Sequence, residues 1–413
     1  MKIESYKTEK LKVEKDLNEM TKKSDLISWI RVALFILIMG LLSYGYFKKI
    51  DIFYAFVAVL TIIFFVIVKL HSDIELKIKY KKSKIQVYQK YIKRLNGTWY
   101  DFKDKGTEYL DENMPYLKDL DIFGEGSLYQ YICSANTIYG KKSLVKHLKQ
   151  NDYKLDYIIK HQEAVKELSN MQDFANEIET LSYLTKENKK KNINKEIKKF
   201  IEVCEDETPN QVKLNKILMI VLPAILIAVL ALCLIGINRT FYFNVLKVVI
   251  IINLLLAFLN MQKSTSILLP IGDFYKNIKV YENIFKEIDK QDFESSYLKE
   301  LKEGLNKDGG SLKAIKELKK IGSYIDLRQN FVANIILNAI VLWDFYCIDM
   351  FDKWKKSYGK NIRTYLEIVG EIEALISLAS ITYVRDDYTF AKVNECDDLK
   401  PEIDFKNLKH PII

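Results

Sequence analysis

Apolar and polar positions divide this chain into a few long apolar runs and strongly charged segments between them. Four runs contain almost no charge: 27–47, 52–68, 217–237 and 240–262. Their only charged residues are Arg31 and Lys247. A helix needs about 20 consecutive apolar residues to cross the hydrocarbon core of a bilayer. The four runs are close to this length, so we expect four transmembrane helices.

Short connections join these runs in two pairs, through 48–51 and through 238–239. Each pair is therefore predicted to form a tight helical hairpin whose outer ends lie on one side of the membrane. Lys and Arg are abundant on that side, with seven lysines in 1–26 and nine basic residues in 69–94. Positive charge is typical of cytoplasmic flanks. We expect a multi-pass protein of the cell membrane, with both termini and the large soluble parts in the cytoplasm.

The segment 330–351 leaves two interpretations open. It is apolar enough for a fifth span, but Asn330, Asn334, Asn338 and Asp344 interrupt it. An odd number of spans would also move the charged C-terminal part out of the cell. The polar interruptions favour a buried helix of the soluble part.

The remaining sequence has helical periodicity. A basic helix is predicted from 69 to 95, ending at the Asn96-Gly97 turn, and further helices are predicted from about 140, over 155–183 and over 361–384. Ser127 is an expected N-cap, with Gln130 three residues later as in a capping box. With few glycines and prolines for 413 residues, the chain is predicted to be all-α.

Composition and candidate chemistry change this picture little. The net charge is only +9, and the mean hydropathy of −0.07 averages apolar runs with charged segments. The five cysteines and four histidines are scattered, so neither a disulfide framework nor metal-ligand spacing is expected. Glu371 and Glu373 lie two apart on a predicted helix, so we expect them on different faces, in contact with solvent. No catalytic motif is present.

Two groups of lysines are candidates for contact with DNA phosphates or anionic lipid. The candidates are Lys81, Lys82 and Lys84 in the predicted helix 69–95, and Lys189, Lys190 and Lys191 in the lysine-rich run 186–199. The alternative for both groups is a solvated basic surface that only sets the membrane topology.

Several blocks resemble DNA mismatch-repair proteins of the MutS family. The blocks LDIFGEGSLYQYI (120–132), TIYGKKSLVKHL (137–148) and HQEAVKEL (161–168) resemble the start of the MutS core domain. GEIEALISLA (370–379) looks like its lever helix, and 401–403 with 409–411 resemble the approach to its ATPase domain. The apolar hairpins make a membrane-anchored MutS-like protein the closest match.

The resemblance implies a core-and-lever module linked to mismatched DNA and to ATP-driven conformational coupling. Complete family members are ATPases, but no G-x-x-x-x-G-K-[ST] sequence occurs here, and Gly140-Lys141-Lys142-Ser143 opens a core helix instead. Phe123-Gly124-Glu125 matches the family's mismatch-reading tripeptide but lies at the entry of the core, where a structural role is expected. ATP and Mg²⁺ are therefore implied only for a complete member, and no cofactor is expected in this chain.

The expected organisation follows from both lines of argument. It comprises an N-terminal cytoplasmic helix (1–26), a transmembrane hairpin (27–68), a basic stem and linker (69–112), MutS-core-like helices (113–216), a second hairpin (217–262), core and lever helices (263–405) and a stub before a missing ATPase domain (406–413). The expected partners are the membrane, a second copy of the chain, DNA and an ATPase domain in trans. The alternative function is a membrane scaffold without a nucleic-acid role.

Overall fold

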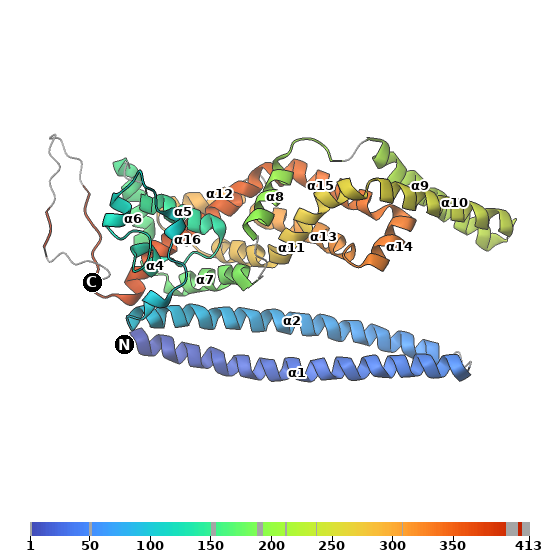
Figure 1. Ribbon diagram of the computed structural model, residues 1–413, viewed down its shortest axis with the longest axis horizontal. Helices are drawn as coiled ribbons and strands as arrows, with labels where there is room; N and C mark the ends of the chain where they lie inside the picture. Colours follow the sequence, from blue (N-terminus) through green and yellow to red (C-terminus); the bar gives the residue numbers. More distant parts are fainter. Residues whose placement is uncertain are drawn as a thin grey trace.

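The computed structural model describes residues 2–48, 52–149, 154–187, 193–210, 213–236, 238–307, 309–393 and 404–406. Within these ranges all regular structure is helical and no strand occurs, which confirms the all-α prediction. Lys189, Lys190 and Lys191 and the motif segments 401–403 and 409–411 lie outside the described residues. Figure 1 shows an elongated molecule, with a long helical hairpin running beside a second helical body.

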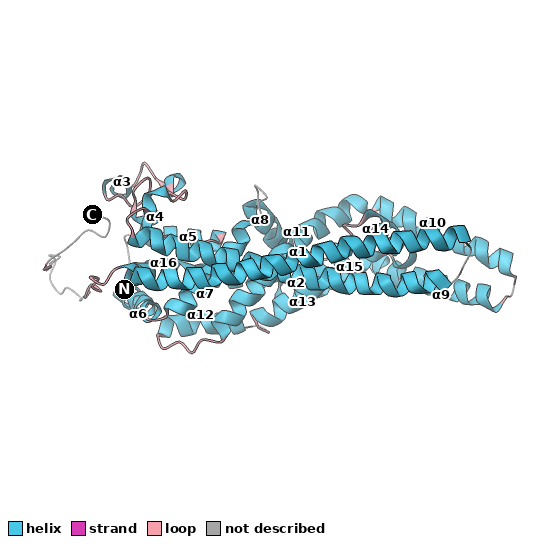
Figure 2. Cartoon of the chain, turned by 90° about the horizontal axis from the view of Figure 1, so that it is seen from below, coloured by secondary structure: helices cyan, strands magenta, loops and turns pink. Residues whose placement is uncertain are grey.

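The long hairpin consists of α1 (Lys2–Lys48) and α2 (Ile52–Leu95). Each is a single helix that joins an apolar half to a charged half, so no break separates the expected segments 1–26 and 27–47. The α2 helix ends at Leu95, directly before Asn96-Gly97, as predicted; Gly97 has φ +74°, which glycine adopts without strain. The two helices lie along the length of the molecule (Figure 2).

Short elements follow α2 and form a small, largely aromatic core, to which Leu144 and Ala374 also belong. The short elements are η1 (Trp99–Asp101), η2 (Thr107–Tyr109), α3 (Tyr116–Asp119) and α4 (Leu128–Ile132). Ser127 caps α4 as predicted, because its Oγ accepts a hydrogen bond from Gln130 N at 3.2 Å. Phe123 is 4% exposed and packs against Tyr109 and Tyr129, so this ring is a core residue and does not project from the surface.

A larger core joins the main body of helices. These are α5 (Ile138–Lys149), α6 (Leu155–Ser169), α7 (Gln172–Glu187), α8 (Ile193–Glu205), α11 (Met261–Asp289), α12 (Ser296–Asn306), α13 (Ser311–Leu327), α15 (Trp343–Tyr358) and α16 (Ile362–Val384), with η3 (Gly359–Asn361) between the last two. The predicted helix 155–183 is in fact two, because the chain turns at Asn170 and Met171. The α16 helix has the expected bounds, and most of its residues are buried in this core.

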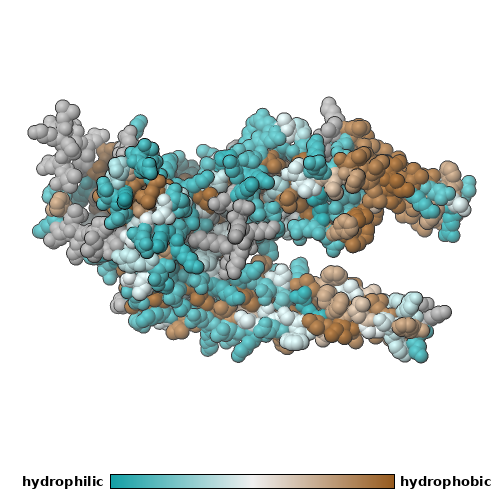
Figure 3. Space-filling model, viewed as in Figure 1, coloured by the Kyte–Doolittle hydropathy of each residue, from teal (hydrophilic) through white to brown (hydrophobic). Residues whose placement is uncertain are grey.

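The second hairpin consists of α9 (Lys213–Ile235) and α10 (Arg239–Leu259). Together with α1 and α2 it gives four helices that are long and apolar enough to cross a membrane. Only 6–11% of their most apolar windows is buried within the protein. Figure 3 shows the apolar surfaces of both hairpins at the same end of the molecule, so one bilayer could contain both.

The segment 330–351 differs from both sequence interpretations, because it is not one helix. It divides into α14 (Phe331–Val341) and α15, which meet at an angle of 82° at Leu342, where φ is +51°. The interrupting polar residues build this bend: Asn330 caps α14, and Asn338 Oδ1 accepts a hydrogen bond from Asp344 N at 3.1 Å. The α15 helix is largely buried, whereas α14 exposes apolar side chains beside α10. Within the described residues, only the bent pair taken together could count as a fifth span.

Candidate functional site

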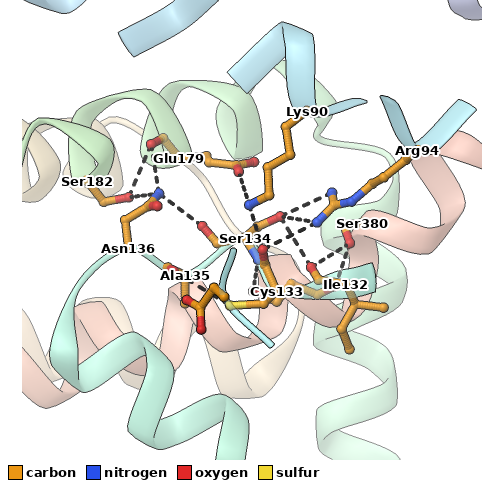
Figure 4. Close-up of polar contacts among 12 residues, drawn as sticks. Lys90, Arg94, Ile132, Cys133, Ser134, Ala135, Asn136, Glu179, Ser182 and Ser380 are labelled. Atoms are coloured by element: carbon orange, nitrogen blue, oxygen red, sulfur yellow. Dashed lines mark hydrogen bonds and ion pairs between the residues drawn. The ribbon is translucent and has the colours of Figure 1, made fainter. Parts of the chain in front are cut away.

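The connection between α4 and α5 is a buried, non-helical segment against which three other helices, α2, α7 and α16, are placed. Its residues Cys133–Thr137 are at most 6% exposed. Peptide groups buried outside a helix need hydrogen-bond partners from elsewhere in the protein. Here the partners come from α2, α7 and α16, so this segment is the junction between the first hairpin and α16 (Figure 4). We call it the coupling junction.

The α16 helix supplies one side of the coupling junction through three side chains on one face. Ser377 Oγ accepts a hydrogen bond from Ser134 N at 3.0 Å, and Ser380 Oγ donates one to Ile132 O at 3.1 Å. Glu373 Oε1 accepts hydrogen bonds from the backbone N–H groups of residues 136 and 137, at 2.9 and 3.3 Å. The Thr137 hydroxyl also bonds to this carboxyl group. The segment is thereby fixed to α16.

Glu373 is one of the carboxyl groups that the sequence placed in solvent, and that expectation is wrong. Glu373 is only 2% exposed. Complete burial raises its pKa, although the hydrogen bonds from Asn136 and Thr137 oppose this effect. Acidic residues on a helix usually face water, so periodicity alone gave no reason to bury this one.

The α2 and α7 helices supply the other side of the coupling junction. Lys90 Nζ on α2 donates hydrogen bonds to Cys133 O at 2.5 Å and to Glu179 Oε1 on α7 at 2.9 Å. Arg94 Nη2 lies 3.4 Å from Cys133 O. Asn136 Nδ2 donates to Ser182 Oγ at 3.1 Å. Since the Glu179 side chain is only 1% exposed, its charge depends on Lys90 for compensation.

The start of α1 is attached to the end of α16. Lys2 Nζ donates hydrogen bonds at 3.0 Å to the carbonyl oxygens of both Thr382 and Arg385, and it pairs with Asp386 at 2.7 Å. A cation at this position satisfies carbonyl groups at the C-terminal end of a helix and complements the helix dipole. Both helices of the first hairpin are therefore bonded to α16 or to the segment that α16 holds.

A second polar cluster joins α5, α6, α12 and α16. His147, His161 and Glu371 each place one ligand atom within 4.8 Å of the others. His147 Nε2 lies 2.8 Å and His161 Nε2 3.5 Å from Glu371 Oε1, which also accepts a hydrogen bond from the Tyr297 hydroxyl at 3.0 Å. Ser143 donates to the other oxygen of Glu371.

Sequence spacing missed this cluster, because its three residues are far apart in the chain and only the fold brings them together. The expectation that Glu371 is solvated is also wrong, since its side chain is only 16% exposed. Burial alone would raise its pKa, but the hydrogen bonds from His147 and Ser143 and the nearby imidazole of His161 hold the pKa well below its usual range. The one sequence signal for this cluster was an acidic residue at 371, between apolar positions of the helix stripe.

The predicted lysines on α2 do not form one free basic patch. Lys81 pairs with Asp16 on α1 at 2.8 Å, and Lys84 lies 3.8 Å from Glu177 on α7. Lys82 is exposed. Two of the three lysines thus bind carboxylates of neighbouring helices.

Comparison of the chain with family models, with curated proteins and with solved structures found no match.

Proposed function

We propose that this chain is a membrane-anchored, MutS-like core-and-lever module of a DNA-binding ATPase assembly. The observation that carries the proposal is the attachment of α16 to both helices of the first hairpin, through Lys2 and through the coupling junction. Rigid helices joined by hydrogen-bonded networks can carry energetic coupling between distant sites. A displacement of α16 would therefore be transmitted to α1 and α2, and a displacement of the hairpin to α16.

The proposed partners follow from the sequence resemblance of 120–148, 161–168 and 370–379 to the MutS core and lever. A MutS-type ATPase domain, carrying ATP and Mg²⁺, would act on α16. A second copy of the chain would complete a dimer, and the assembly would bind mismatched DNA. The chain itself supplies transmission and attachment and holds no nucleotide in this proposal.

We place the protein in the cell membrane, with both termini and the helical body in the cytoplasm. The abundance of lysines on the charged halves of α1 and α2 supports this orientation. The apolar surfaces of both hairpins at one end of the molecule support a single bilayer around them (Figure 3).

DNA binding by the full chain in lipid nanodiscs tests the proposal. Fluorescence anisotropy would compare a matched duplex with one that carries a single mismatch, over a range of salt concentrations. We expect binding that weakens steeply as salt rises, because each neutralised phosphate releases counterions. The exposed Lys82 should contribute, so Lys82→Glu should weaken binding, whereas Lys290→Glu, directly after the end of α11, should not. No binding at about 50 mM salt, where phosphate contacts are strong, would overturn the DNA part of the proposal.

One observation favours a second candidate, a membrane scaffold without a nucleic-acid role. Lys81 and Lys84 are paired with carboxylates inside the chain, which leaves less free positive charge on α2 for phosphates. A photo-crosslinking residue at position 82 separates the two candidates. In the scaffold this residue would capture one cytoplasmic protein and no DNA, whereas in the DNA-binding module it would capture DNA.

A further inference from the structure

The cluster of His147, His161 and Glu371 is built from residue types that bind first-row transition metals. Imidazole nitrogens and a carboxylate oxygen are the ligands of many zinc sites, with metal–ligand distances of about 2.0–2.2 Å. Two ligands of a tetrahedral ion at such distances lie about 3.3 Å apart. The observed separations from Glu371 Oε1, 2.8 Å to His147 Nε2 and 3.5 Å to His161 Nε2, bracket this value.

The hydrogen bonds of His161 leave one ring nitrogen available for a ligand. Its Nδ1 lies 2.7 Å from Tyr157 O. A carbonyl oxygen only accepts, so Nδ1 carries the proton and the neutral ring has its lone pair on Nε2. That Nε2 atom is buried and makes no well-formed hydrogen bond, and it faces Glu371 Oε1 at 3.5 Å. Histidines that bind metals through one nitrogen usually donate the other N–H group to a carbonyl or carboxylate oxygen.

Neighbouring side chains hold the three residues in place. The His161 ring lies between those of Tyr157 and Tyr297, with ring centroids 3.7 and 4.1 Å away. The hydroxyl groups of Tyr297 and Ser143 donate to Glu371 and orient its carboxylate. Such outer contacts are typical of metal sites and fix the geometry of the ligands before the ion binds.

We propose that His147, His161 and Glu371 form a binding site for a divalent transition-metal ion, with Zn²⁺ as the expected occupant. Because the protein supplies only three ligands, water would take the fourth position of a tetrahedral ion. The three side chains are 7–16% exposed, so the site is nearly closed. The ion would join α5 and α6 to α16, and so fix α16 within the helical body. This proposal stands on the cluster alone and does not depend on the proposed function.

Metal binding by the purified full chain in detergent tests the proposal. After treatment with a chelator, the protein would be titrated with Zn²⁺ alone, and with Co²⁺, whose visible absorption reports a tetrahedral site with nitrogen and oxygen ligands. We expect one equivalent of Zn²⁺ to bind, to raise the melting temperature and to displace Co²⁺. Failure of the wild-type protein to bind Zn²⁺ would overturn the proposal and leave a proton-linked His–Glu network in its place.

Substitutions of the three residues and of a neighbour test whether the ion binds at this cluster. His161→Phe keeps the aromatic stack but removes the ligand, and Glu371→Gln keeps much of the hydrogen bonding; each should lose the stoichiometric Zn²⁺. Tyr297→Phe removes an orienting contact and should weaken affinity by about 10- to 100-fold. His71→Gln is the control, because His71 bonds to Ser24 and Ser28 in the first hairpin and should not affect Zn²⁺ uptake. Unchanged Zn²⁺ affinity in folded His161→Phe, checked by circular dichroism, would contradict the assignment.

Discussion

Single charged side chains hold the coupling junction together, and the half-buried Lys90 is the clearest case. Its ammonium group compensates Glu179, whose side chain is almost completely buried, and also bonds to a carbonyl of the 133–137 segment. A buried pair of this kind adds little stability compared with apolar residues, but loss of one partner leaves an uncompensated charge in the interior. Removal of Lys90 should therefore lower the free energy of unfolding.

We predict that Lys90→Met lowers the free energy of unfolding by about 3–5 kcal/mol, because Glu179 loses its counter-charge. The double variant Lys90→Met/Glu179→Met should recover much of this loss, since no charge is then buried. Denaturant unfolding in detergent, followed by circular dichroism, measures both. The control is Lys93→Met on the same helix: Lys93 pairs with the exposed Asp101, so its change should be below about 1 kcal/mol. Equal effects of the two single variants would contradict this account.

Glu282 predicts a dependence of stability on pH. Burial raises its pKa, but Lys286 and Lys319, each 2.6 Å away, outweigh burial and hold the pKa below its ordinary value. A lowered pKa in the folded state stabilises the protein above the unfolded-state pKa of about 4.3, and this contribution is lost as the pH falls through the folded-state pKa. We expect Glu282→Gln to lose roughly 1 kcal/mol at neutral pH and progressively less below about pH 4. A difference between wild type and variant that does not change with pH would contradict this.

At the scale of helices, the crossing of α5 and α16 depends on two glycines. A Cβ atom at Gly370 would lie 2.6 Å from Tyr139 Cβ and closer still to the Tyr139 backbone, and one at Gly140 would lie 2.9 Å from Glu373 Cβ. The two helices therefore approach more closely than any larger residue would permit. This close approach brings Ser143 and His147 within reach of Glu371.

We predict that Gly370→Ala destabilises the protein by about 1–3 kcal/mol, because a backbone group cannot move aside as the end of a side chain can. It should also weaken Zn²⁺ binding by moving α5 away from Glu371. Gly272→Ala in α11 is a matched control: its Cβ would meet only Ile325 Cγ2, at 3.4 Å, so it should be neutral or slightly stabilising. Thermal unfolding of the two variants compares them directly, and a fall in melting temperature for Gly272→Ala equal to that for Gly370→Ala would refute the close-approach argument.

The helices could be predicted from sequence to the extent that one local signal defines each of them. Long runs with almost no charge predicted both hairpins, and apolar periodicity predicted α16 with its bounds. The break between α6 and α7 and the bend at Leu342 carry no glycine or proline, the usual signals of an interruption. The metal-type cluster depends on the crossing of α5, α6 and α16, which is a property of tertiary packing. Lysines were predicted as binding residues from charge alone, which does not reveal carboxylates on neighbouring helices.

At the scale of the whole molecule, the proposed topology predicts which surface positions a reagent outside the cell can reach. In a variant without native cysteines, a cysteine at Asn238, the N-cap of α10, should react with a membrane-impermeant maleimide in intact cells. A cysteine at Lys12, on the charged half of α1, should react only after the cells are permeabilised. The proposed orientation requires this pattern. Labelling of Lys12→Cys in intact cells would instead place the N-terminal half of α1 outside the cell.

Neither α1 nor α2 is interrupted where its apolar half meets its charged half. At 1.5 Å per residue α1 is about 70 Å long, and about 30 Å is enough to cross the hydrocarbon core of a bilayer. The remaining length of about 40 Å is a stiff rod, unlike a flexible linker, and the helical body is bonded to it through Lys2 and Tyr6 and to the parallel length of α2 through Tyr80 and Lys90. In the proposed topology the protein is thus a spacer of fixed length that reaches only a thin layer of cytoplasm beneath the bilayer. Whatever it binds must come to the membrane to be bound.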